Sequence, residues 1–489
     1  MVAPDLSRGD DRRDGRDAGG HAVSVVDPDQ TSRAADTPTT RTADRWWLAG
    51  FRPLLLRLHF YVGLFVGPFL LVAAVTGLLY TIAPQLESSV HAEQLRVPAV
   101  GTRAVPLADQ VTAAQAAVPE GTLKSVRPPS SADGTTRVVF ASPETAEGYT
   151  RTAFIDPYTG RSRGVLDTYG EWLPVRAWLD DLHRNLHLGE PGRIYSELAA
   201  SWLWVLALSG LLLWWARARK ARRDAGGPGR LRRLLMPRGG KGRGRLLSWH
   251  GSIGVWALLG MLFLSATGMT WSTYAGATVS EVRSALSWQA PSVTKGLPST
   301  AAPVAAEDQP AAVQRVLTAA RTAGLDGPVE VSVPSSGAAW KVSQTKRSWP
   351  VAQDSMAVDP QSGTVLNRID FADWPVMAQL ANLAIDTHMG LLFGVPNQIA
   401  LALIAVGIIA AVLIGYRMWW LRRPTRGTGA RLPGPPGAGR APSRIALVTM
   451  VLVAIAVGVA FPVLGGSLLL FCGIDAVWQA TRRAGPTGS

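Results

Sequence analysis

The sequence is poor in the residues that build cross-links, zinc clusters and common cofactor sites. Its 489 residues contain one cysteine, Cys472, which excludes a disulfide framework or a cysteine-ligated zinc cluster within the chain. A C-x-x-C-H segment is missing, so the ordinary covalent attachment of a c-type haem is excluded. No flavin- or nicotinamide-binding motif occurs, because the glycine-rich stretch 225–244 follows no strand and lacks a phosphate-loop pattern. Histidine is also scarce, with seven copies, so the position of each one is informative.

Apolar residues, in contrast, are abundant and gathered in long runs. They make up 47% of the chain, and several runs reach the roughly 20 residues that a helix needs to cross a lipid bilayer. A final run at 445–480 is interrupted by Pro462 and Gly465-Gly466, which predicts either one kinked helix or, as we favour, a hairpin of two. The four earlier runs predict membrane helices at 50–82, 197–216, 249–275 and 395–420.

The formal net charge of +14 is concentrated in two short segments between these runs. Residues 217–248 hold twelve Lys or Arg and one acid, and residues 421–444 hold six Arg and no acid. Because short basic loops stay on the cytoplasmic side, we expect a multipass membrane protein with a cytoplasmic N-terminus and residues 1–45 as a disordered cytoplasmic tail. The segments 83–196 and 276–394 then face outward. Nucleic acid is not an expected partner, since the first basic segment lacks interleaved aromatic residues.

Two halves of the chain repeat one set of spaced residues, which predicts an internal duplication. In each half a glycine lies four residues after a histidine (63−59 and 254−250), and a Thr-Gly pair ends eighteen after it (77−59 and 268−250), about 27 Å further along a helix. A second histidine lies thirteen residues after a proline (187−174 and 388−375) and two before a glycine. The matched residues are His59, Gly63, Thr76, Gly77, Pro174, His187 and Gly189 in the first half, and His250, Gly254, Thr267, Gly268, Pro375, His388 and Gly390 in the second.

The two outward segments carry matching helix and strand signals. The predicted helices are 105–118 and 311–323, and the predicted strands are 136–140, 151–155, 329–333, 339–343 and 356–358. Each segment then reaches a related turn, 156–160 or 359–363, in which proline fixes φ and glycine supplies a positive φ. Each outward segment is therefore expected to be an α+β domain.

Together these motifs resemble the PepSY-associated transmembrane family, over about residues 50–425. The resemblance is carried by a histidine opening a membrane helix, the D-P-x-[ST]-G turns, an L-H-x-x-L-H-x-G segment at 182–189, and G-x-x-x-W-W exits at 210–215 and 415–420. The fold expected is an α-helical multispanning membrane protein with an internally duplicated four-helix core, a C-terminal helical hairpin and two outward α+β PepSY-like domains. The resemblance also implies a haem-binding reductase of a bacterial-type inner (plasma) membrane that acts on ferric iron, often as a ferric siderophore. The flavodoxin-reductase module that some relatives carry has no counterpart here.

Four histidines are the candidate cofactor ligands. A metal-binding side chain in or near the bilayer normally faces the bundle interior and has a partner. By depth they form an inner pair, His59 and His250, and an outer pair, His187 and His388. Two axial imidazoles suit a b-type haem used for electron transfer, so two haem b groups per chain are expected. Glycines one turn after the inner histidines would remove bulk where a flat macrocycle presses.

His183 lies one helical turn before His187 and could take its place as the outer ligand. The spacing favours His187, because the residue four before His388 is Ala384. His183 is then an alternate ligand, a proton donor or a metal contact. Three nearby carboxylates could orient an imidazole, or could be solvated loop charges: Asp180, Asp181 and Asp386.

The expected function is di-haem transmembrane electron transfer that reduces an outward ferric chelate, with a siderophore as the substrate implied by the resemblance. The donor would be a separate cytoplasmic reductase or membrane quinol, and no catalytic side chain is assigned beyond the haem iron ligands. Two other hypotheses stay open. One is a non-enzymatic PepSY-type binding or regulatory membrane protein whose histidines only pack, and the other is a haem or metal transporter that uses the histidines transiently.

Overall fold

The computed structural model describes residues 43–223, 235–237, 239–294, 303–334, 337–422 and 444–483. The expected cytoplasmic tail, apart from its last three residues, lies outside the described residues, as do the middle of the basic segment 217–248 and nearly all of 421–444. From Leu48 onward the chain forms one compact unit, and every contact given below lies within it.

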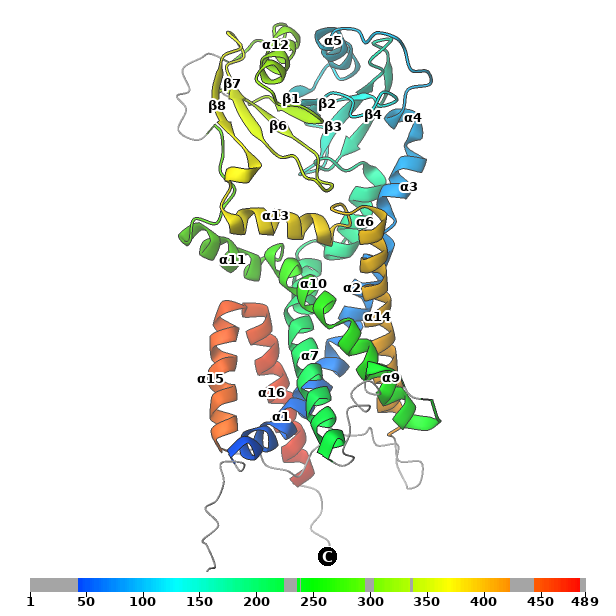
Figure 1. Cartoon of the computed structure of the whole chain (residues 1–489), viewed down its shortest axis with the longest axis vertical. Helices are drawn as coiled ribbons and strands as arrows, with labels where there is room; N and C mark the ends of the chain where they lie inside the picture. The colour runs from blue at the N-terminus through cyan, green and yellow to red at the C-terminus, as the bar shows by residue number, and fades with distance from the viewer. Residues whose placement is uncertain are drawn as a thin grey trace, which may run out of the picture. The chain divides into compact units, whose positions relative to one another are not determined.

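One order of elements occurs twice along the chain (Figure 1). A bent helix pair comes first in each half, α1 (Ala43–Phe65) with α2 (Gly67–Tyr80), and α9 (Gly242–Trp256) with α10 (Leu258–Thr270). Helices α3 (Ala83–Val90) and α4 (Ala92–Leu95), or α11 (Tyr274–Ala285), lead to α5 (Leu107–Ala117) or α12 (Gln309–Thr322) and then to four strands. Each half closes with a helix at the end of its strands, α6 (Pro174–Asn185) or α13 (Val376–His388), and a long helix, α7 (Glu190–Arg223) or α14 (Val395–Trp420).

Helices lie over each of the four apolar runs that were expected to cross the membrane. Two segments, Glu190–Arg219 and Val395–Trp420, are long and apolar enough to cross a membrane alone. The segments Phe51–Tyr80 and Gly242–Thr270 reach that length only as bent pairs, each with an angle of 57° at its break. The described residues therefore hold two spans, or up to four if each bent pair is one span, by length and composition.

The first of these bends has a visible cause in the sequence. Pro68 lies in the first turn of α2, where it has no N–H to donate to the carbonyl of Leu64 and its ring crowds that carbonyl. The Leu64 oxygen instead accepts a hydrogen bond from the Tyr416 hydroxyl at 2.5 Å. This contact ties the bend of the first half to α14 of the second. The other bend, between Trp256 and Leu258, has no proline, and no contact explains it.

All eight strands form one antiparallel sheet in the order β4-β3-β2-β1-β5-β6-β7-β8. The strand β1 (Thr122–Arg127) pairs with β5 (Val329–Ser332), with Val126 opposite Val331, so the two expected α+β modules share a single sheet. The other strands are β2 (Thr136–Ala141), β3 (Thr150–Ile155), β4 (Ser162–Thr168), β6 (Trp340–Gln344), β7 (Ser355–Val358) and β8 (Val365–Ile369), with a short 3-10 helix η1 (Phe371–Asp373) after the last. The five predicted strands and both predicted helices are confirmed, whereas the sequence analysis missed β1, β4 and β8.

Helices α5 and α12 pack against each other and cover one face of this sheet (Figure 1). Between them and the sheet lies one continuous apolar core, in which Phe140, Val126 and Met356 are fully buried. One buried face and one open face are normal for an antiparallel sheet. The open face is free to carry polar residues, and these become important below.

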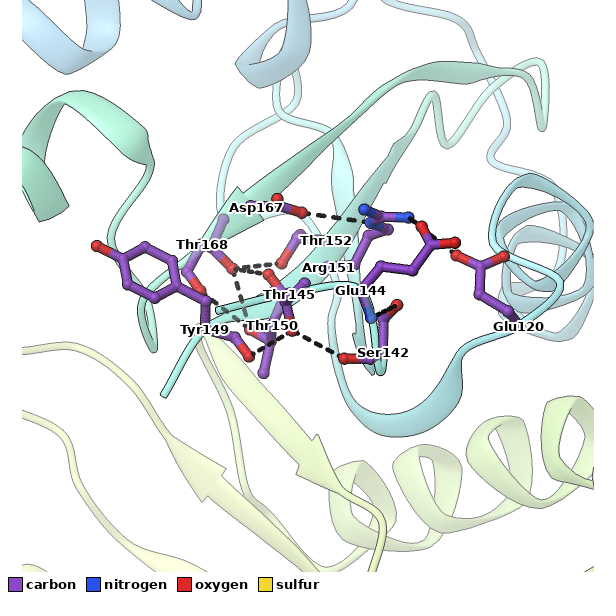
Figure 2. A network of polar contacts seen from close by, with 10 residues as sticks. All are labelled: Glu120, Ser142, Glu144, Thr145, Tyr149, Thr150, Arg151, Thr152, Asp167 and Thr168. Atoms are coloured by element: carbon purple, nitrogen blue, oxygen red, sulfur yellow. Dashed lines mark hydrogen bonds and ion pairs between the residues drawn. The ribbon is translucent and has the colours of Figure 1, made fainter. Parts of the chain in front are cut away.

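A network of polar contacts fixes the edge of the sheet around β3 and β4 (Figure 2). The guanidinium of Arg151 donates to Glu144 at 2.8 Å, to Glu120 at 3.0 Å and to Asp167 at 3.3 Å. Hydrogen bonding to these carboxylates raises the pKa of Arg151 above its ordinary value. The charge of Arg151 is thus paired with three acids, all from the first α+β module.

The C-terminal apolar run forms two helices, α15 (Arg444–Ala460) and α16 (Pro462–Arg483), which pack against each other as a hairpin (Figure 1). Glycines let the two backbones approach, because a Cβ at Gly465 would lie 2.7 Å from the Cα of Gly458. The indole N–H of Trp202 in α7 donates to Ser467 in α16 at 2.8 Å. The favoured two-helix interpretation of 445–480 is therefore correct.

Candidate functional site

The structure brings His59 of α1 and His250 of α9 together. Their ring centroids are 6.1 Å apart, and the ring planes meet at 82°. His59 Nδ1 lies 2.9 Å from the Ser209 hydroxyl, and this hydroxyl donates its hydrogen to the Leu206 carbonyl at 3.2 Å. His250 Nδ1 lies 3.0 Å from the Ala411 carbonyl. Because both oxygens act as acceptors, each Nδ1 carries the ring hydrogen.

A second pair has the same chemistry in α6 and α13. His183 Nδ1 lies 3.0 Å from the Thr76 hydroxyl, and His388 Nδ1 lies 2.5 Å from the Thr267 hydroxyl. Each threonine hydroxyl donates to a carbonyl one turn earlier in its own helix, at 2.9 and 2.8 Å, and so accepts from the imidazole. Burial lowers the pKa of His183 to about 4 and that of His388 to about 3, and His183 is near enough to lower the second further. A Cβ at Gly77 would lie 3.0 Å from the His183 ring.

All four imidazoles are therefore held in one tautomer. The Nδ1–H is donated to a neighbouring helix, which leaves the lone pair of Nε2 available to a ligand or metal. Burial keeps the pair in α6 and α13 neutral at physiological pH, as a metal-binding imidazole must be. The Thr-Gly motif of each half thus orients a histidine of the same half.

Two glycines of the G-x-x-x-W-W exits lie against the inner imidazoles. A Cβ at Gly210 would be 3.2 Å from the His59 ring, and one at Gly415 would be 3.8 Å from the His250 ring. These two positions are equivalent in the repeat, as are the histidines they contact. The exits therefore shape the inner pair through their glycines, a role that the sequence analysis did not assign.

The glycines one turn after the inner histidines have a different environment. A Cβ placed at Gly63 or Gly254 meets no heavy atom within 4 Å, apart from its own helix backbone and chain neighbours. Each lies two residues before the end of its helix (65−63 and 256−254), ahead of the 57° bend, so the helix-interior cost of glycine relative to alanine, about 0.8–1.0 kcal/mol, is an upper limit there. Packing against the described residues therefore leaves room for a methyl group at both positions.

One known family matches the region of the chain that contains these histidines. A family model described as the PepSY-associated TM region matches residues 56–422. The chain belongs to the PepSY-associated TM family. A search of curated proteins gives no significant match. All four imidazoles of the two pairs fall inside the matched region of this PepSY-associated TM protein.

The structure does not place His187 in the outer pair, where the repeat spacing put it. The helix α6 ends at Asn185, eleven residues after its proline (185−174), whereas α13 continues to His388, thirteen after its own (388−375). His187 follows in an exposed turn with a positive φ of 56°. By its contact with the Thr-Gly motif, the structural counterpart of His388 is His183. The spacing differs between the halves because the two helices end at different points.

His187 has its own partners in that turn. Its Nδ1 lies 2.9 Å from the Asp181 carboxylate, and its ring lies 4.9 Å from the Trp178 ring. Asp181 is therefore one of the three carboxylates considered that orients an imidazole. The imidazole it orients is that of His187, which lies outside the pair in α6 and α13. Asp180 instead pairs with Arg184 at 3.6 Å.

Asp386 takes part in an ion-pair network that links α13 to the sheet. Its side chain is 1% exposed and lies 2.6 Å from Arg347 of the β6–β7 loop, which also binds Glu171. Burial raises the pKa of Asp386 despite this partner. Burial also pushes the pKa of Glu171 upward, but the charges of Arg347 and Arg127 outweigh it and hold that pKa below its usual value. The sequence offered no sign of Arg347, because its partner lies 39 residues away along the chain.

The geometry of the inner pair fits a haem. With metal–nitrogen bonds of about 2 Å, two imidazoles on one iron hold their ring centroids roughly 6 Å apart, close to the observed 6.1 Å. Within the described ranges, no group of three or more His, Cys, Asp or Glu could hold a metal ion. A porphyrin supplies four ligands to its iron and leaves two for the protein to supply. Pairs of imidazoles therefore suit haem better than a metal ion that must take all its ligands from the protein. Around the outer pair, the Trp271 ring lies edge-on to His388 at 5.3 Å.

Proposed function

We propose that this protein holds two b-type haems and transfers electrons across the membrane to an extracytoplasmic ferric chelate, such as a ferric siderophore. The observation that carries the proposal is the repeated pair of imidazoles, each with its Nδ1–H fixed by a neighbouring helix and its Nε2 available. His59 and His250 would hold the inner haem, and His183 and His388 the outer one. Held by these residues, a b-type haem would supply one-electron transfer.

The chain's own residues set the ligands in place before any cofactor binds. Ser209 and the Ala411 carbonyl fix the inner imidazoles, and Thr76 and Thr267 fix the outer ones. Such partners hold the tautomer and ring orientation and raise the basicity of the metal-binding nitrogen. Along α1 and α2, His59 and Thr76 are 17 residues apart (76−59), roughly 25 Å of helix before the bend shortens it, so the two pairs occupy different levels.

The repeated order of elements supports an internal duplication in which each half contributes one histidine to each pair. A haem would then be shared between the halves at both levels. The positive charge of 217–248 and 421–444 supports a cytoplasmic N-terminus in a bacterial-type inner membrane. The shared sheet then faces outward, where the ferric acceptor would dock. The electrons would come from a cytoplasmic reductase or from quinol, because the sequence contains no flavin or nicotinamide motif.

The proposal is tested by electron delivery from the purified full chain in proteoliposomes. The protein is reduced with dithionite, excess reductant is removed, and a ferric chelate is added outside while the reduced α-band and trapped Fe(II) are followed. We expect the α-band to decay as Fe(II) appears, and His388→Ala to abolish most of the delivery. His91→Ala, which removes a histidine between α3 and α4, should leave it unchanged.

Other results would contradict the proposal in distinguishable ways. A colourless protein that remains folded would favour the non-enzymatic PepSY-type binding module. Labile, substoichiometric haem together with haem or metal accumulation in the vesicles would favour the transporter. Stable haem that no ferric chelate reoxidises would leave an electron carrier with a different acceptor.

A further inference from the structure

Two arginines lie side by side on neighbouring strands of the sheet. Arg127 of β1 is directly opposite Arg137 of β2 in the antiparallel register. Like charges directly opposite each other destabilise a sheet, so such a pair needs compensation. Arg127 has it, because its guanidinium lies 2.8 Å from Glu330 and 3.6 Å from Glu171.

Arg137 has no such compensation among the described residues. It makes no ion pair or hydrogen bond there, and its guanidinium lies 5.9 Å from the centre of the Phe154 ring. Burial, and then the charge of Arg127, lower its pKa, although Glu87 and Glu171 offset part of the effect from beyond ion-pair distance. No guanidinium nitrogen of Arg137 is buried without a partner, so this half-buried group keeps its hydrogen-bond donors accessible and could donate them to a bound anion.

The pair opens into a polar pocket of about 440 Å³. This volume is within the range of small-molecule sites. Hydroxyl groups of the β1–β2 loop and of α3 also line it, from Ser130, Ser131 and Ser88. Its charged lining residues are Arg96, Arg127, Arg137, Lys346 and Arg347, with Asp133 as the one acid. Asp133 lies 3.6 Å from Arg96, and Arg127 and Arg347 are paired with acids outside the lining. Among the described residues, the positive charge of the pocket that has no acid partner is therefore that of Arg137 and Lys346.

One wall of this pocket connects directly to the outer histidine pair. Arg347 lines the pocket and binds Asp386, which lies two residues before His388 in α13. The β6–β7 loop makes a second contact just after α13, where the backbone N–H of Trp349 donates to the Leu392 carbonyl at 2.8 Å. A ligand in the pocket would thus sit against the loop that is fastened to the helix of the outer pair.

We propose that this pocket, with Arg137 as its unpartnered cation, binds the ferric acceptor, and that the acceptor is an anionic oxygen-donor chelate of the catecholate or carboxylate class. This inference rests on the proposed function for the identity of the ligand. The guanidinium groups would donate hydrogen bonds to the anionic oxygens, which neutral hydroxamate complexes match less well. Arg137 is a binding residue here and does not touch the haem ligands.

Equilibrium binding to the oxidised full chain in detergent tests the pocket without any electron transfer. The probes are trianionic ferric tris-catecholate, ferric citrate and neutral ferric tris-acetohydroxamate. We expect the two anionic probes to bind more tightly, and binding to weaken as salt rises from about 0.05 to 0.5 M. Arg137→Gln should weaken them about tenfold or more, since a hydrogen bond to a charged group is worth at least about 1.4 kcal/mol. Arg137→Lys should retain part of the affinity.

Arg151→Gln is the matched control, because it removes the same charge from the adjacent strand at a site saturated by three acids (Figure 2). It should leave binding unchanged. Equal loss in both variants, no loss in Arg137→Gln, or no binding by the wild type would overturn the pocket assignment. Anion binding that depends on Arg137 in a protein that never reduces iron would uphold the pocket and refute the reductase. If ferric chelates are reduced with a KM that Arg137→Gln leaves unchanged, the reductase is upheld and the pocket is refuted.

Discussion

The glycines one turn after the inner histidines allow haem binding to be tested apart from protein packing. A methyl group at Gly63 or Gly254 would touch no described heavy atom beyond its own helix backbone and chain neighbours. At helical positions such as these, Gly→Ala removes backbone entropy from the unfolded chain and should stabilise the protein by about 0.4–1 kcal/mol. Without a cofactor, both substitutions are therefore expected to be neutral or favourable.

A macrocycle held by His59 and His250 would change this expectation. The added methyl group would press on its face, and overpacking typically costs about 1–3 kcal/mol, which corresponds to a roughly five- to hundredfold weaker haem affinity. Haem retention during dialysis against apomyoglobin, together with thermal unfolding, measures both quantities on the same variants. Gly466→Ala in α16 is the control, since it too meets no heavy atom within 4 Å. If Gly63→Ala and Gly254→Ala retain the inner haem as well as the control does, the placement of the macrocycle against α1 and α9 is refuted.

Three further predictions follow from the outer level. His183→Ala should remove the outer haem while His187→Ala retains it, as read from the reduced spectrum. Thr267→Val should weaken the outer haem about 10- to 100-fold without unfolding the chain, because it removes the acceptor that fixes an imidazole. Arg347→Gln should lower the thermal unfolding temperature, since it leaves Asp386 buried without its partner, a loss that typically costs about 3–5 kcal/mol.

Matched variants distinguish these effects from general damage. Thr318→Val removes a hydroxyl that donates to its own helix, as Thr267 does, but lies in α12 away from the histidines. Arg368→Gln removes an arginine from an ion pair whose side chains are 40% exposed. Retention of the outer haem in Thr267→Val, or an unfolding temperature for Arg347→Gln equal to that of Arg368→Gln, would contradict the respective prediction. Loss of haem in His187→Ala with retention in His183→Ala would reverse the assignment made from the structure.

Local patterns in the sequence predicted the elements well, because they depend on nearby residues. The apolar runs located the helices of the two to four candidate spans, and alternation located the strands β2, β3, β5, β6 and β7. The strands β1 and β4 were missed because their pattern is weak, with exposed or half-buried residues on both faces. The single sheet was not foreseen either, since the pairing of β1 with β5 joins residues about 200 positions apart.

The candidate site was predictable only as far as the repeat was regular. The inner histidines lie at matching positions in equivalent helices, six residues before the ends of α1 and α9 (65−59 and 256−250), although the sequence analysis had expected them to open those helices. The outer pair depended on where α6 ends, and the positive φ angles of Leu186 and His187 end it before the repeat position. The roles of Thr76 and Thr267 had a signal, because both lie in the repeated Thr-Gly motif. Arg137 and Arg347 had none, since their surroundings exist only after the sheet has formed.

Haem content per chain is the most direct test of the account. The full chain is purified, its haem is quantified from the dithionite-reduced minus oxidised spectrum, and the value is divided by the protein concentration. The account predicts two b-type haems per chain with the spectrum of paired imidazoles, and one remaining in His183→Ala. Folded wild-type protein without haem, or with haem that survives in a variant lacking all four of His59, His250, His183 and His388, would contradict it.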